Sequence, residues 1–123
     1  MVPIIKDIQI NEADNLDPKR FTPGSLSSFH CTFNLFIGPS DSEGMESFQL
    51  TVCSPDWLAE RCRSQGYVLG RHHLIVDHFD LESITKIISK LITRCADETW
   101  NQVAEKLSRI AYWEFEDYQN PMT

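Results

Sequence analysis

Four side chains that could ligate a metal ion lie close together in the second half of the sequence. They are His72, His73, Asp77 and His78. Imidazole and carboxylate groups are common zinc ligands, so a metal-dependent enzyme built on them is one hypothesis. If residues 72–79 form a strand, His73 and Asp77 point to one face and the other two to the opposite face. A zinc site needs three or four converging ligands, so the sequence predicts strand histidines, no metal and no cofactor.

The remaining reactive side chains give no support to catalysis. Carboxylates are paired at Asp41 and Glu43 and at Glu114 and Glu116, but a catalytic pair needs a pocket that separates the two pKa values. A cysteine–histidine dyad could only be chosen arbitrarily, because the chain holds four cysteines and four histidines. No glycine-rich phosphate-binding loop occurs. The sequence therefore predicts no catalytic residue and a protein that is not an enzyme.

The segment 106–118 combines aromatic and acidic side chains. It begins as an amphipathic helix and continues with Tyr112, Trp113, Phe115 and Tyr118 interleaved with Glu114, Glu116 and Asp117. Aromatic residues supply rigid contact area at interfaces, and acids attract basic proteins while repelling phosphate. Two interpretations remain open. Either the segment binds a basic protein, or its aromatics complete the core and its acids are merely solvated.

The composition is that of one acidic globular domain, residues 1–123. The chain is 41% hydrophobic and 24% charged, and 18 Asp and Glu against 11 Lys and Arg give a formal net charge of −7. This charge disfavours nucleic acid and anionic membranes as partners and favours basic proteins. No apolar stretch is long enough to span a bilayer, and the first residues lack the plan of a signal peptide. We therefore expect a cytoplasmic protein.

The cysteines are widely spaced and form no Cys-x-x-Cys motif. They are Cys31, Cys53, Cys62 and Cys95. In a reducing compartment, cysteines of this kind are expected as small buried apolar residues.

Hydrophobic periodicity predicts three strands in the first part of the chain. Ile4, Ile8 and Ile10 share a parity, although Lys6 interrupts their face, and residues 11–28 are polar and predict a long loop. A strict period of two follows at Phe29, Cys31, Phe33, Leu35 and Ile37, and again at Phe48, Leu50 and Val52. The acidic turn at residues 38–44 predicts a hairpin that pairs these two strands.

Helix signals dominate the second half. Ser54-Pro55-Asp56 predicts the start of a helix, and Gly66 predicts its end. The expected buried stripe of this helix consists of Trp57, Leu58 and Cys62. After the fourth strand at 72–79, Asp80 is expected to cap a helix with apolar residues at steps of three and four. Thr99 with Gln102 predicts a capping box before the last helix. The order favours an α+β fold, with a mainly antiparallel four-stranded sheet and about three helices packed on one face.

Several spaced blocks of the sequence, in one order, carry a family resemblance. They are Ile37-Gly38-Pro39, residues 46–55 with Trp57-Leu58, residues 70–76, Trp100 with residues 103–110, and residues 113–118. Together they extend from about the second strand to the end, whereas residues 11–28 show no similarity. In these blocks the chain resembles the immunity protein 8 family of bacterial polymorphic-toxin and contact-dependent growth inhibition systems.

The resemblance implies a small cytoplasmic protein, encoded next to a toxin, that binds the toxin's C-terminal domain and blocks it. Such toxins are often nucleases, and nuclease domains tend to be basic, which agrees with the acidic composition. The expected toxin-binding residues are Asp41, Glu43 and Glu46 in the hairpin and Glu114, Glu116 and Asp117 in the tail. Binding either covers the toxin's active site or acts elsewhere on it. A different hypothesis is an acidic protein-interaction module or nucleic-acid mimic unrelated to toxins.

Overall fold

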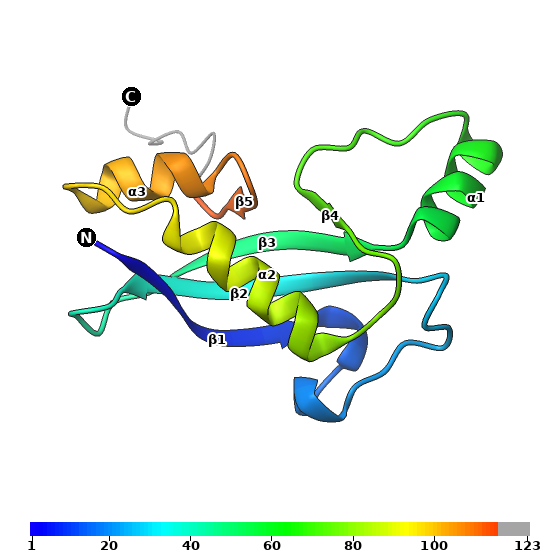
Figure 1. Ribbon diagram of the computed structural model, residues 1–123, viewed down its shortest axis with the longest axis horizontal. Helices are drawn as coiled ribbons and strands as arrows, with labels where there is room; N and C mark the ends of the chain where they lie inside the picture. The colour runs from blue at the N-terminus through cyan, green and yellow to red at the C-terminus, as the bar shows by residue number, and fades with distance from the viewer. Residues whose placement is uncertain (116–123) are drawn as a thin grey trace, which may run out of the picture.

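Three long antiparallel strands form most of the sheet in the computed structural model, which describes residues 1–115 (Figure 1). They are β1 (Pro3–Ile10), β2 (His30–Pro39) and β3 (Glu46–Cys53), adjacent in that order. On β2, Cys31, Phe33 and Leu35 are buried, while the alternate residues are half-buried. The predicted alternation and the pairing of β2 with β3 are therefore confirmed.

A bulge at Lys6 changes the face of β1. Ile5 pairs with Ile37, but Asp7 pairs with Phe36, so one extra residue separates the two halves of the strand. Ile8 and Ile10 consequently face the core together with Ile5, whereas Ile4 is 41% exposed. The prediction that Ile4 shares a face with Ile8 and Ile10 is wrong, because a bulge reverses the parity of every residue beyond it.

The outer edge of β3 is shared by two short strands. β4 (His73–Ile75) pairs in parallel with Thr51–Cys53, and β5 (Tyr112–Trp113) pairs antiparallel with Phe48 and Gln49. The strand predicted over 72–79 is thus much shorter, because His72 has a positive φ of 58° and residues 77–78 form a bend. β5 adds a fifth strand to the predicted four, and two residues are too few to show a period in the sequence.

Helix α1 (Pro55–Gln65) begins and ends where the sequence predicted. Ser54 Oγ accepts a hydrogen bond from the Trp57 amide at 3.4 Å, and Gly66 closes the helix with a left-handed φ of 91°. No residue of α1 is buried, however, and Cys62 is exposed. The predicted buried stripe is wrong, because α1 lies beyond the end of β3 instead of over the sheet (Figure 1).

Helices α2 (Leu81–Thr93) and α3 (Trp100–Leu107) cover one face of the sheet (Figure 1). Ile84, Ile88 and Ile92 of α2 are buried against the sheet, as are Val103 and Leu107 of α3. The capping box at the start of α3 is confirmed by hydrogen bonds in both directions. The α+β fold and its element order are as predicted. Within the described residues, no helix is both long and apolar enough to cross a membrane.

The predicted long loop between β1 and β2 contains two short 3-10 helices. They are η1 (Asn11–Ala13) and η2 (Pro18–Arg20). Ala13 is buried in the core, and Glu12 Oε1 accepts a hydrogen bond from the Thr32 amide at 2.6 Å. This loop is therefore fastened to β2 at its beginning.

Candidate functional site

The hairpin between β2 and β3 presents two of the predicted acids to solvent. Asp41 and Glu43 are exposed, and neither carboxylate forms a hydrogen bond or ion pair within the described part of the chain. The hairpin is closely packed at its base, because a Cβ placed on Gly38 would lie 1.8 Å from the Gly44 carbonyl oxygen. The Lys6 ammonium group also donates a hydrogen bond to the Ser42 carbonyl. The two carboxylates are thus held on a well-positioned loop and remain available to a partner.

Glu46 has a different environment from the other hairpin acids. Its Oε1 accepts a hydrogen bond from the Trp100 indole at 3.0 Å, and its Oε2 accepts one from the Trp113 indole at 2.6 Å. All three side chains are half-buried. Glu46 begins β3, Trp100 begins α3, and Trp113 belongs to β5. Both carboxylate oxygens therefore join the C-terminal part of the chain to the sheet.

Glu114 is also engaged within the protein. Its Oε1 accepts a hydrogen bond from the Ser47 amide at 3.0 Å, and its own amide donates to the Ser47 carbonyl at 3.1 Å. Glu114 and Glu46 therefore come together at the start of β3. Glu116, Asp117 and Tyr118 lie outside the described residues, so the predicted tail patch is placed only in part.

The aromatic residues of the tail divide between core and surface. Trp113 stacks on Phe48 with ring centroids 6.3 Å apart, and it packs against the core. Its neighbour Tyr112 points the other way and is 46% exposed. The alternation seen in the sequence is therefore that of an edge strand, with one aromatic on each face.

The histidines of residues 72–78 do not converge. His72 Nε2 lies 2.6 Å from the Ser108 carbonyl oxygen, and His73 Nδ1 lies 2.7 Å from the Arg71 carbonyl oxygen. His78 Nδ1 lies 3.3 Å from a carboxylate oxygen of the adjacent Asp77, and both side chains are exposed. Within residues 1–115, no three His, Cys, Asp or Glu side chains are grouped so that they could hold a metal ion.

Three of the four cysteines are buried and one is not. Burial raises the pKa of the Cys31 thiol to about 12, with a further contribution from Glu12, and it raises the pKa of Cys53 to about 11. Burial also raises the pKa of Cys95. The prediction of small buried residues is confirmed for these three and wrong for Cys62, which is exposed on α1.

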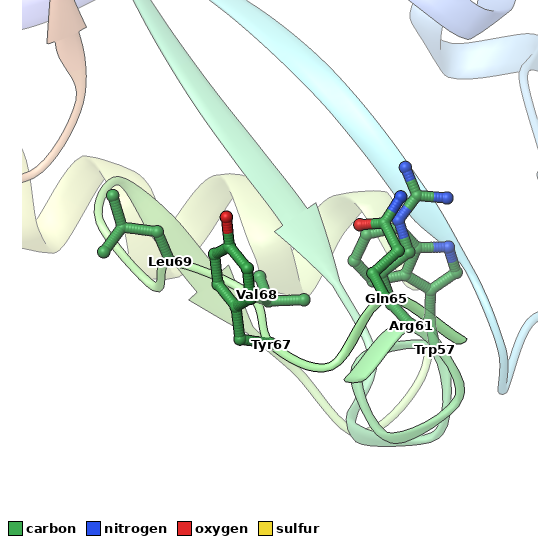
Figure 2. A pocket seen from close by; sticks show the side chains of 6 residues that line it. All are labelled: Trp57, Arg61, Gln65, Tyr67, Val68 and Leu69. Carbon is green, nitrogen blue, oxygen red and sulfur yellow. The ribbon is translucent and has the colours of Figure 1, made fainter. Parts of the chain in front are cut away.

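A hollow beside α1 was not anticipated from the sequence (Figure 2). It is lined by Trp57, Arg61, Gln65, Tyr67, Val68 and Leu69. The Arg61 guanidinium lies over the Trp57 ring, 5.6 Å from its centroid. Tyr67 and Leu69 are 74% and 76% exposed, which is unusual for such large apolar side chains. The apolar run between Gly66 and Gly70, which fits no strand or helix, is the sequence signal that could have indicated it.

Comparison with known families decides what kind of protein this is. The family model described as immunity protein 8 matches residues 4–118, nearly the whole chain. The chain belongs to the immunity protein 8 family. No curated protein and no solved structure is significantly similar to it.

Membership of this family makes the chain an immunity protein directed against a toxin. An immunity protein binds its toxin, and exposed side chains without a partner among the described residues are free to contact it. By this criterion Asp41 and Glu43 are candidate contact residues. Glu46 and Glu114 serve first to hold β5 and α3 in place.

Proposed function

We propose that this immunity protein neutralises a basic nuclease domain by stoichiometric binding in the cytoplasm. The nuclease would be the C-terminal domain of the protein encoded immediately upstream, in a contact-dependent growth inhibition or related polymorphic-toxin system. The observation that carries this proposal is the hairpin, which holds Asp41 and Glu43 exposed and without a partner among the described residues. Charged groups that a fold leaves unpaired are suited to steer and fix a partner of opposite charge.

The proposed inhibition uses carboxylates in place of phosphates. A nuclease binds the phosphate backbone of its substrate with basic side chains. Carboxylates of the immunity protein that enter this basic surface occupy positions that substrate phosphates use. Asp41 and Glu43 would make the direct contacts, and the tail acids Glu114, Glu116 and Asp117 would add to the attraction. Glu46 would contribute chiefly by holding the tail beside the hairpin.

Co-purification tests the proposed partner. The chain is expressed together with the upstream protein's C-terminal domain, and nuclease activity of that domain is measured with and without it. A stable one-to-one complex without nuclease activity is the expected result. A folded, active domain that forms no complex with the chain would refute the proposed function.

Charge reversal tests the role of the hairpin. We expect Asp41→Lys with Glu43→Lys to raise the Kd roughly tenfold or more and to reduce its dependence on salt, because both effects come from lost attraction. Glu98→Lys with Glu105→Lys changes the net charge equally at exposed positions near α3, and it should leave the Kd much closer to the wild-type value. Equal effects of the two double variants would show that only net charge matters.

A further inference from the structure

Helices α2 and α3 cover one face of the sheet (Figure 1). The strand register places a row of polar side chains on the opposite face. The register places Gln9 beside Asn34, Asn34 beside Gln49, and Gln49 beside Tyr112. The row thus crosses β1, β2, β3 and β5. Residues adjacent to the row along the strands, such as Leu35 and Leu50, point instead into the core. Helices α2 and α3 pack against the other face, and the short helix η1 meets the row through the Asn11 side chain.

The centre of this row offers hydrogen-bond acceptors to a partner. The Asn34 amide donates to the Asn11 side-chain carbonyl, and Gln49 Nε2 donates to Asn34 Oδ1 at 3.4 Å. These contacts orient the Gln49 side chain, while its own carbonyl oxygen accepts no hydrogen bond from the described residues. An oriented carbonyl on an exposed face suits the N–H groups of arginine and lysine.

Aromatic side chains flank the row and could act as anchors. Tyr112 ends it on β5, with its ring 6.1 Å from that of His72. Toward the other end of the strands, Trp57 stacks on His30 with ring centroids 4.4 Å apart. Trp57 also lines the hollow that contains Tyr67 and Leu69 (Figure 2). Tyrosine and tryptophan are enriched among the residues that dominate binding energy, so this face combines anchors with polar groups.

The negative charge is unevenly divided between the two layers. Residues 1–53, which form β1 to β3 and their loops, hold seven acidic and three basic side chains, a net charge of −4. Residues 80–111, which form α2, α3 and their connections, hold five of each and are neutral. Asp7 is exposed on the uncovered face itself, where it pairs with Phe36. A basic partner is therefore attracted to the sheet and its hairpin, not to the helical layer.

We infer that the toxin binds across the sheet face opposite α2 and α3, with its basic side chains against the row centred on Asn34 and Gln49. This inference rests on the proposed function, because it locates the same basic partner on the surface. The hairpin acids lie where β2 ends and β3 begins, so they would meet the edge of the bound domain while the row meets its centre.

Paired substitutions of opposite sign at one position test the inference. In complexes with the upstream protein's C-terminal domain, Gln49→Arg should raise the Kd roughly tenfold or more, since it places like charge in the contact. Gln49→Glu has nearly the same shape as the wild type and should speed association at low salt. Ser89→Arg and Ser89→Glu make the same charge changes on the exposed side of α2 and should have little effect. Melting temperatures confirm folding, and Gln9→Arg replaces Gln49→Arg if the latter unfolds.

The outcomes separate the inference from the proposed function. A higher Kd for Gln49→Arg and faster association of Gln49→Glu, with neither change in the Ser89 variants, would support binding at the sheet face. The wild-type complex could instead be weakened by Ser89→Arg and left unchanged by Gln49→Arg and Gln9→Arg. This result would place the toxin on the helical layer and overturn the inference alone. Absence of any wild-type complex would overturn the proposed function as well.

Discussion

Removal of the Glu46 carboxylate should lower the free energy of unfolding, because this group holds α3 and β5 against β3. The exposed contact residues Asp41 and Glu43 are not altered by this change. Glu46 accepts one indole hydrogen bond on each oxygen, from Trp100 and from Trp113. Glu46→Ala leaves both indole N–H groups without their partner. Glu46→Gln keeps the shape but has only one oxygen, so it satisfies one indole at most.

The expected size of the effect follows from the burial of the group. A hydrogen bond to a charged group is worth about 1.5–3 kcal/mol. The two tryptophans are only half-buried, so water compensates part of the loss, and about 2 kcal/mol for both bonds is a reasonable expectation. With an unfolding entropy of about 2.1 cal/mol/K per residue, this corresponds to a fall in Tm of about 8 °C for a 123-residue chain.

Thermal and urea unfolding of four proteins measures the interaction directly. These are the wild type, Glu46→Ala, Trp113→Phe and the double variant, which form a double-mutant cycle. We expect a coupling energy of about 1 kcal/mol between Glu46 and Trp113. Glu43→Ala is the matched control, since its carboxylate has no partner in the described structure, and its Tm should stay at the wild-type value. A Glu46→Ala protein as stable as Glu43→Ala, or a fully additive cycle, would refute a structural role for Glu46.

Three further predictions concern the packing of the hairpin and the burial of the cysteines. Gly38→Ala should destabilise the fold by about 2 kcal/mol, because its methyl group meets backbone in the hairpin, whereas Gly24→Ala enters open space and should have little effect on urea unfolding. In the native protein, a maleimide should label Cys62 rapidly and the buried thiols only after unfolding, as mass spectrometry would show. Burial raises the pKa of Cys31 from 9.0 to about 12 and that of Cys53 from 9.0 to about 11, so both thiols ionise first in the unfolded chain. The free energy of unfolding is therefore at its full value below pH 9.0, and it falls as the pH rises from 9.0 toward these two pKa values. Unchanged urea stability between pH 8 and 11 would contradict this.

Much of the fold was predictable because its signals are local. The alternation on β2 and β3 depends only on which neighbouring side chains are apolar, and the structure buries that face as predicted. The helix starts at Ser54 and Thr99 were equally evident, since a capping side chain bonds to an amide three residues away. The family blocks were also readable from the sequence, and the family match confirms them. The choice of Asp41 and Glu43 as toxin contacts stays a prediction.

Tertiary structure alone decided which acids are available for binding. In the sequence, Glu43 and Glu46 are equivalent acids of one hairpin, but Glu46 is bonded to indoles 54 and 67 residues away. β5 forms because β3 has a free edge beside it, and α1 buries no residue because it lies beyond the sheet. The bulge at Lys6 likewise depends on pairing with β2. The sequence determined β2 and β3, the helix starts at Ser54 and Thr99, and the family. The function of each carboxylate depended on long-range contacts, which local periodicity does not encode.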